Sequence, residues 1–357
     1  MLQDDNLPSG IWGNLVKWIL WAASGFYSAG HFSRMSVYRS GLLKSRSLPC
    51  WTVSVGNLAA GGTGKTPVVL ALAKAFSERG HKIAILSRGY GDKHKEPTKI
   101  ISDGLKLRAH PPNAADEAYL LASQLPGVPV LTGSDRYTLG IQAIKEFGVE
   151  GVILDDGYQH VQLTREKNLL LLDAEKPFGN GFLLPRGALR EPPGAIRRAG
   201  GVLFTRAHSS TPEAVEKFRS KYPSLPIMVS RFVPNAMVDV KSGELLPIEA
   251  HKALWVCGIA RPSEFFRLAS ESGIQEAGHM VFPNHHRYTL DDVKEIFSRA
   301  RTNGASGVLT TEKDGVKLKS IWRNGFPCRA LRIGLEILSG ESLWETWKYP
   351  PDSSTNQ

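Results

Sequence analysis

Cysteine is scarce in this 357-residue chain, which contains three cysteines far apart from one another. An odd number of widely spaced cysteines forms neither a disulfide framework nor a metal-ligand cluster, so we expect a protein of a reducing compartment. Internal repeats are missing as well. Hydrophobic residues make up 42% of the chain and charged residues 22%, which excludes a disordered protein. The length favours about two domains.

Acidic residues are lacking between Ile11 and Cys50. Five basic residues lie in the same stretch: Lys17, Arg34, Arg39, Lys44 and Arg46. They supply half of the chain's net charge of +10. A net charge of this size indicates an anionic partner, which is nucleic acid, an anionic membrane or a phosphorylated substrate. Because no nucleic-acid-binding motif accompanies the charge, we expect no nucleic acid partner.

Apolar residues recur at helical spacing in this N-terminal stretch: Trp12, Leu15, Val16, Ile19, Ala23 and Phe26. The pattern predicts that residues 1–46 form an amphipathic helical segment at the surface of an anionic membrane. Packing against the protein's own core is the alternative. A spanning helix is disfavoured because Lys17 and several small polar residues interrupt the ~20 apolar residues that it needs. Asp4 and Asp5 argue against a cleaved signal peptide.

A glycine-rich loop follows a short apolar strand at 51–55 and precedes a helical pattern at 66–79. Its residues are Gly61, Gly62, Thr63, Gly64, Lys65 and Thr66. This context predicts a P-loop, in which backbone N–H groups and the helix N-terminus hold phosphate oxygens. Lys65 would contact the β- and γ-phosphates, and the Thr66 hydroxyl would hold Mg²⁺. The usual P-loop pattern has a glycine six positions before the lysine, and Ala59 stands there in this chain. The loop instead resembles the variant loops of partitioning and metal-insertion NTPases. Ala60 stands where those proteins have a second lysine.

Carboxylates that could bind Mg²⁺ follow another apolar strand, at 150–154. Asp155 and Asp156 end this strand. At the carboxyl edge of an open α/β sheet they can reach the metal directly or through water. One of the two aspartates can serve another role.

Three further polar clusters stand outside these motifs. Asp116 and Glu117 begin a helical pattern, where acids also interact favourably with the helix dipole. Arg190 and Glu191 lie together in a loop rich in proline and glycine. Two adjacent histidines at 285 and 286 precede a capped helix. Adjacent histidines seldom bind one metal, so an acid–base role or surface exposure is favoured.

Strand-like runs alternate with helical stretches along most of the chain. The strand-like runs lie at 51–55, 82–87, 128–132, 150–154, 168–173 and 201–205, and the helical stretches at 66–79, 114–124, 134–147 and 211–220. The alternation predicts an α/β fold of P-loop NTPase type with a doubly wound, mostly parallel sheet. We expect a P-loop core at 47–226, a β-linker at 227–248, a smaller C-terminal α/β lobe at 249–340 and a tail at 341–357.

The ordered set of motifs resembles the tetraacyldisaccharide 4′-kinase family, the lipid A 4′-kinases of Gram-negative bacteria. The motifs are Val55-Gly56-Asn57 with 61–67, Ser87-Arg88-Gly89-Tyr90-Gly91, Asp116-Glu117, 155–160, 184–192, 282–288 and Thr310-Thr311-Glu312-Lys313-Asp314. The resemblance covers residues from about 10 to about 335. It implies a kinase core and transfer of the γ-phosphate of ATP to the 4′-hydroxyl of an acylated glucosamine disaccharide 1-phosphate. It also implies Mg²⁺ and a peripheral location on the cytoplasmic face of the bacterial inner membrane, with no stable protein partner.

The resemblance also assigns roles to individual residues. Asp116 falls at the position of the catalytic base and His285 at that of its partner, with His286 as the alternative. Asp155, Asp156 and Glu191 fall at positions associated with Mg²⁺ and nucleotide. Three further residues match ones that line the active site in the family: Arg136, Arg190 and His160. Asn284 stands where the family has an aspartate, so electrostatic support of His285 from that side is weaker.

Other classes of protein share parts of this pattern. A partitioning or membrane-targeting ATPase would keep the P-loop and the N-terminal helix, but it explains neither Asp116 nor His285. A metal-insertion GTPase would need a guanine-reading motif, which residues 311–314 only echo. A non-enzymatic binding module does not explain the acid-rich site. Because Asp116 and His285 come from the two different predicted lobes, we expect lobe closure to bring them together.

Overall fold

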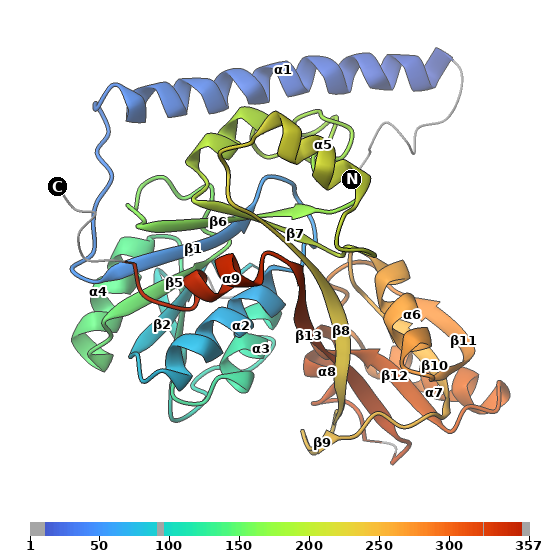
Figure 1. Cartoon of the computed structure of the whole chain (residues 1–357). Helices are drawn as coiled ribbons and strands as arrows, with labels where there is room; N and C mark the ends of the chain where they lie inside the picture. Colours follow the sequence, from blue (N-terminus) through green and yellow to red (C-terminus); the bar gives the residue numbers. More distant parts are fainter. Residues whose placement is uncertain (1–10, 91–95, 324, 352–357) are drawn as a thin grey trace. The chain divides into compact units, whose positions relative to one another are not determined.

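The computed structural model describes residues 11–90, 96–323 and 325–351. It forms two compact units (Figure 1). The first consists of Met1–Arg88, Asp135–Arg231 and Ile337–Gln357, and the second of Gly89–Ser134 and Phe232–Glu336. This division differs from the predicted boundaries, because residues 89–134 cluster with the C-terminal lobe and not with the P-loop core.

The first unit is built on five parallel strands. Strand β1 (Trp51–Asn57) lies between β5 (Gly151–Asp155) and β6 (Lys167–Asp173). Strand β2 (Ile83–Ser87) pairs with β5 on one side, and β7 (Gly201–Thr205) pairs with β6 on the other. Their side chains are almost all buried, as expected for parallel strands covered on both faces. The P-loop therefore leaves a central strand.

Helices of the first unit connect these strands. They are α2 (Lys65–Glu78), α4 (Arg136–Phe147), the 3₁₀ helix η2 (Pro193–Arg198) and α5 (Glu213–Lys221). The predicted strands and helices of residues 51–221 match the observed ones within about two residues. Strand β8 (Ile227–Asp239) pairs in parallel with β7 and antiparallel with β9 (Leu245–Leu246), in the segment predicted as a β-linker.

The second unit has its own parallel strands. Strand β10 (Lys252–Cys257) lies between β11 (Gln275–Val281) and β12 (Gly307–Thr311), and β13 (Cys328–Ser339) pairs with β12. Its helices are α3 (Asp116–Gln124), α6 (Pro262–Glu271), α7 (Leu290–Thr302) and α8 (Glu312–Leu318). Strand β3 (Thr98–Asp103) pairs antiparallel with β4 (Pro129–Gly133). Strand β3 and helix α8 were not predicted, because both are short and rich in polar residues.

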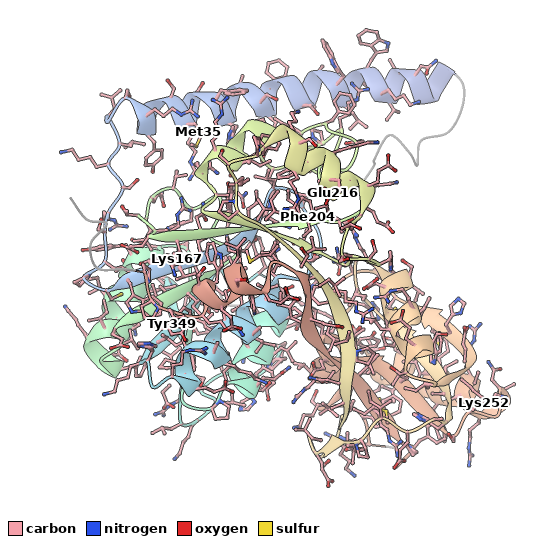
Figure 2. All side chains as sticks on the ribbon, in the orientation of Figure 1. Met35, Lys167, Phe204, Glu216, Lys252 and Tyr349 are labelled. Carbon is pink, nitrogen blue, oxygen red and sulfur yellow. The ribbon has the colours of Figure 1, made fainter. Side chains whose placement is uncertain are left out.

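Helix α1 (Ile11–Arg39) belongs to the first unit and exposes its apolar residues. Leu15, Ile19 and Phe26 are 49%, 59% and 81% exposed. Their spacing places them on one side of the helix, and Figure 2 shows ring-bearing side chains on its outer side. Leu15, Ile19 and Phe26 of the predicted stripe are thus turned away from the protein, whereas Val16 and Ala23 are half-buried. The side chain of Trp12 lies outside the described part. None of the described helices has the length and apolar character needed to cross a membrane.

The C-terminal segment contains a helix that the sequence analysis treated as part of a tail. Helix α9 (Glu341–Trp347) buries Trp344 and Trp347, which are each 5% exposed. The Lys167 ammonium donates to the backbone carbonyls of Thr346 and Tyr349 at 2.8 and 3.0 Å. Residues 341–351 are therefore part of the first unit.

Replacing Trp347 with alanine is expected to lower the free energy of unfolding by about 3–5 kcal/mol, because a large buried ring is lost and leaves a cavity. Denaturant unfolding monitored by circular dichroism measures the change. Leu343 lies on the same helix and is 38% exposed, so Leu343→Ala is the matched control, with an expected change of about 0.5 kcal/mol or less. Equal effects of the two variants would contradict the burial of this helix.

Candidate active site

The P-loop is held in place by side chains from neighbouring strands. Thr63 is buried, and its hydroxyl accepts a hydrogen bond from the Asn57 amide at 2.6 Å. The Thr63 carbonyl accepts a hydrogen bond from the Thr205 hydroxyl of β7 at 3.1 Å. Gly64 directly precedes α2 with φ of 77°, a left-handed conformation that glycine adopts at little cost. The loop is therefore shaped before any phosphate binds.

Strand β1 also explains the glycine of the Val55-Gly56-Asn57 motif. A Cβ atom on Gly56 would lie 2.8 Å from the backbone nitrogen of Tyr158. Tyr158 is completely buried and its backbone cannot withdraw. The close approach of these two segments therefore requires glycine at this position.

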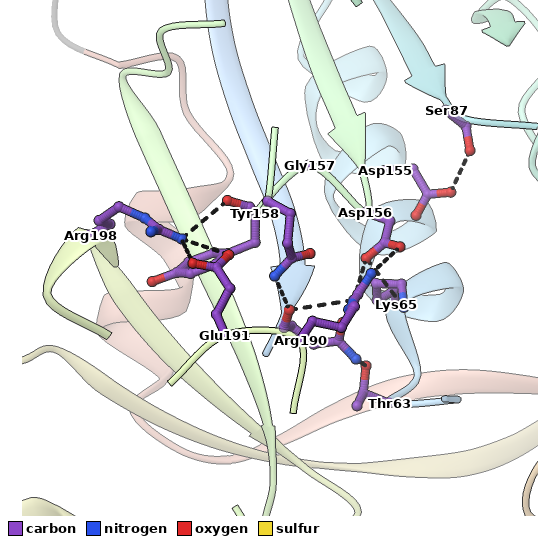
Figure 3. Close-up of polar contacts among 12 residues, drawn as sticks. Thr63, Lys65, Ser87, Asp155, Asp156, Gly157, Tyr158, Arg190, Glu191 and Arg198 are labelled. Carbon is purple, nitrogen blue, oxygen red and sulfur yellow. Dashed lines mark hydrogen bonds and ion pairs between the residues drawn. The ribbon is translucent and has the colours of Figure 1, made fainter. Parts of the chain in front are cut away.

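The two carboxylates after β5 lie beside the P-loop, as Figure 3 shows. Asp155 is buried and accepts a hydrogen bond from the Ser87 hydroxyl at 3.0 Å. Asp156 has φ of 55°, which is uncommon for a residue with a side chain and typical of functional sites. One oxygen of Asp156 lies 3.5 Å from the Lys65 ammonium. The structure therefore brings both aspartates to the end of the strand where the sequence placed them.

Arg190 completes this arrangement. Its guanidinium donates to both carboxylate oxygens of Asp156 at 2.9 Å and also to the Asn57 side chain. Burial by itself would raise the pKa of Asp156. The hydrogen bonds from Arg190 and the charges of Lys65 and Arg190 outweigh burial and hold the pKa at about 2. Asp156 is thus ionised at neutral pH and orients both cations.

Glu191 has a different environment from the two aspartates. It is almost completely buried, and Arg198 donates to its two oxygens at 2.9 and 2.7 Å (Figure 3). In the described part of the chain, no three His, Cys, Asp or Glu side chains form a group that could hold a metal ion. In the structure, Glu191 therefore does not form a metal-binding group with Asp155 and Asp156.

The oxygen atoms near the P-loop fit Mg²⁺ nevertheless. Proteins usually hold this ion through one or two carboxylates together with substrate phosphates, and do not enclose it in a protein cage. Asp155 and Asp156 could provide the carboxylates, and the buried Thr66 lies in the first turn of α2. These three residues form a donor set of the right chemistry.

The loop that carries Arg190 and Glu191 also contacts the inner side of α1. The Ser24 hydroxyl donates to the Leu183 carbonyl at 3.0 Å, and the Tyr27 hydroxyl donates to the Arg190 carbonyl at 3.0 Å. His31 Nε2 lies 3.7 Å from a carboxylate oxygen of Glu191. These contacts come from the helix side opposite to Leu15, Ile19 and Phe26. One helix thus meets the nucleotide-site loop with one side and exposes apolar residues on the other.

Arg136 and His160 lie together in the first unit. Arg136 is the first residue of α4 and is buried. Burial, followed by the positive charges of Arg136 and Arg165, lowers the pKa of His160 to about 4. The His160 imidazole is therefore neutral at neutral pH.

The second unit contains the other pair of predicted site residues. Asp116 is the first residue of α3, and its carboxylate lies 3.8 Å from Nδ1 of His285. Both residues belong to the same compact unit. The hypothesis that lobe closure brings them together assumed two different lobes and is therefore wrong, because residues 89–134 fold with the C-terminal lobe.

The local structure distinguishes the two adjacent histidines. His286 stacks on Phe282 with ring centroids 4.7 Å apart, and its Nε2 lies 3.0 Å from the Asp292 carboxylate at the start of α7. His285 has φ of 60°, and its backbone N–H donates to the Gly258 carbonyl at 3.1 Å. This turn directs the two side chains to different neighbours, so His285 is the histidine beside Asp116.

Helix α8 supplies residues that the sequence analysis did not assign. Lys317 lies 4.0 Å from the Asp116 carboxylate and 2.7 Å from that of Asp314. Lys313 forms an ion pair with Glu117, the residue after Asp116. The Thr-Thr-Glu-Lys-Asp motif marked this segment, but the motif ends before Lys317, and no spacing rule links residue 317 to residue 116.

Comparison with known proteins identifies the family to which this chain belongs. The family model described as Tetraacyldisaccharide-1-P 4'-kinase matches residues 16–347. A tetraacyldisaccharide 4'-kinase from Syntrophus aciditrophicus is 39% identical over 331 residues, covering 89% of this chain and 88% of the relative. Another, from Anaeromyxobacter dehalogenans strain 2CP-C, is 38% identical over 341 residues, covering 93% and 90%.

A solved structure extends the likeness to the fold. The crystal structure of LpxK from Aquifex aeolicus in complex with ATP has a TM-score of 0.74 and 30% sequence identity. The likeness covers 94% of this chain and all of that one. It confirms the predicted α/β fold class, and the family match confirms the resemblance found in the motifs. On this evidence the chain belongs to the tetraacyldisaccharide 4′-kinase family.

Proposed function

We propose that this chain is an ATP-dependent kinase that transfers the γ-phosphate to the 4′-hydroxyl of a tetraacyldisaccharide 1-phosphate, giving lipid IVA in lipid A biosynthesis. The observation that carries the proposal is the Asp116–His285 pair, 3.8 Å apart, in a chain that also has a variant P-loop before α2. A P-loop ATPase that only hydrolyses ATP does not need such a carboxylate–histidine pair in addition to its P-loop. A kinase needs a group that accepts the proton of its substrate hydroxyl.

The first unit provides the nucleotide-binding groups. Backbone N–H groups of residues 61–66 and the N-terminus of α2 would hold the phosphates of ATP. Lys65 and Arg190, both oriented by Asp156, would neutralise charge that develops on the transferred group. The resemblance to the family implies that Arg136 lines the same site.

Thr66, Asp155 and Asp156 would hold Mg²⁺, with Glu191 as a further oxygen donor. When bound, the ion would neutralise negative charge on the β- and γ-phosphate oxygens. Glu191 would have to exchange its ion pair with Arg198 for this role.

The second unit provides the proton acceptor. As the 4′-oxygen bonds to the γ-phosphorus, the bond between that phosphorus and the β,γ-bridging oxygen breaks and ADP leaves. The hydroxyl proton passes to the Asp116 carboxylate. His285 lies 3.8 Å from this carboxylate, so it would receive the proton afterwards through one water or on a closer approach in the substrate complex. Its side chain is 51% exposed and would release the proton to solvent.

Helix α1 supports a peripheral location on the cytoplasmic face of the inner membrane. Its exposed apolar side suits the headgroup region of an anionic bilayer, as do four basic residues: Lys17, Arg34, Arg39 and Lys44. The fifth, Arg46, donates to both carboxylate oxygens of Asp135. The acylated disaccharide would be taken from the same bilayer.

Asp116→Asn is expected to lower kcat by about 10²-fold or more while leaving ATP affinity nearly unchanged, because the variant keeps the shape of the side chain but cannot accept a proton. Transfer of label from γ-labelled ATP to the acylated disaccharide 1-phosphate measures the effect. Glu117→Gln, on the same turn of α3, is the matched control and should retain most of the activity. Label that moves to water instead of lipid in the unaltered protein would contradict the kinase assignment.

Replacing Leu15, Ile19 and Phe26 with serine is expected to weaken binding to phosphatidylglycerol vesicles by at least about tenfold, because three exposed apolar side chains are lost from α1. ATP affinity should stay unchanged, since Ser24, Tyr27 and His31 on the other side of α1 remain. Vesicle flotation and nucleotide titration measure the two affinities.

The control for this experiment replaces three equally exposed leucines elsewhere, Leu105, Leu245 and Leu290, with serine. A similar loss of vesicle binding in the control would contradict a specific role of α1. Deletion of residues 1–46 is a less informative variant, because it also removes the contacts of α1 with the loop that carries Arg190.

A further inference from the structure

Helix α8 is joined to α3 by ion pairs between side chains far apart in the sequence. Lys313 pairs with Glu117, and Lys317 approaches Asp116, the first residue of α3. The Gln124 amide at the other end of α3 donates to Glu312 at 3.0 Å. All of these residues lie in the second unit. The unassigned family motif at 310–314 therefore belongs to a segment that holds the helix of the proposed base.

Lys317 is the most buried of the α8 cations in these contacts. Its side chain is 9% exposed, and its ammonium lies 2.7 Å from one oxygen of Asp314, which is completely buried. The other oxygen of Asp314 accepts hydrogen bonds from the Gly258 backbone N–H at 2.9 Å and the Thr311 hydroxyl at 2.7 Å. The ammonium also lies 5.3 Å from the centre of the Tyr288 ring. Lys317 is thus fixed on several sides.

The Asp314 carboxylate alone explains why a cation is buried here, since a buried carboxylate needs a partner. It does not explain why the same ammonium lies 4.0 Å from Asp116, whose side chain is 20% exposed. Both Lys317 and His285 approach the same oxygen of Asp116, Oδ2, at 4.0 and 3.8 Å. Both distances exceed that of a hydrogen bond, but two groups that approach the same oxygen from their own side favour one orientation of the carboxylate.

We propose that Lys317 is a positioning residue for Asp116: anchored by Asp314, its ammonium holds Oδ2 and so presents Oδ1 of the same carboxylate to the substrate hydroxyl. The inference rests on the proposed role of Asp116 as the base. A base in the correct orientation forms the reacting hydrogen bond at no further entropic cost, so loss of the ammonium lowers kcat more than it changes either KM.

The variant for the test must not leave a buried charge without a partner. Lys317→Met alone would isolate the Asp314 carboxylate and could unfold the unit. The double variant Lys317→Met/Asp314→Asn removes both charges together. It is expected to lower kcat by about tenfold or more, with KM for ATP and for the lipid within about threefold of the unaltered protein. Lys317→Arg, which keeps the positive charge, is expected to retain more kcat than the double variant, and thermal unfolding reports the folding of each protein.

A mutant cycle separates this inference from the proposed function. In an Asp116→Asn background, the double substitution is expected to cause no further loss of kcat, because its effect acts through the carboxylate. If Asp116→Asn itself keeps full activity, the proposed function fails. If Asp116→Asn is impaired but the folded double variant has unaltered kcat, only the role of Lys317 fails.

Lys313→Met is the matched control, because Lys313 also joins α8 to α3 but pairs with Glu117. It should leave kcat within about twofold, since it does not contact Asp116. A loss equal to that of the double variant would overturn the inference in favour of simple docking of α8. If the double variant does not fold, Lys317→Gln/Asp314→Asn and Lys317→Arg decide the matter, because neither leaves a buried charge without a partner. Equal and unaltered kcat in both would overturn the positioning role.

Discussion

The ion pairs of Asp156 with Lys65 and Arg190 are the interaction on which the nucleotide site depends. They join three segments that are distant in the sequence: the P-loop, the end of β5 and the loop that follows residue 183. A nearly buried carboxylate between two cations stays ionised, as its pKa of about 2 indicates, and both cations are thereby directed to one place. Through Tyr27, the same loop contacts α1, so the surface helix and the nucleotide site share one structural element.

The second unit repeats this arrangement with the charges reversed. There a buried cation, Lys317, lies between the carboxylates of Asp314 and Asp116. In both units a charged partner holds the group with the proposed chemical role, and in the second unit the anchoring Asp314 is completely buried whereas Asp116 is 20% exposed. This arrangement limits side-chain motion where a reacting atom must be placed, and it leaves the reacting group accessible to substrate.

Much of the fold could be predicted from local patterns. Continuous apolar runs indicated the buried parallel strands, and the glycine spacing around Lys65 indicated the loop between β1 and α2. The short helix α8 and strand β3 were not predicted, because neither has enough apolar residues to show a helical or strand periodicity. Helix α9 was taken for part of a tail because nothing local reveals that Trp344 and Trp347 are buried against the first unit.

The sequence by itself determined the P-loop, the parallel α/β architecture and the family, since each depends on residues close together or on an ordered set of motifs. Only the tertiary structure decided that His285 and not His286 lies beside Asp116, that Glu191 pairs with Arg198, and that Lys317 stands next to the proposed base. It also decided which side of α1 faces the protein. The physical reason is the same in each case: these pairings join residues from separate elements, and only the packing of those elements sets their distance and direction.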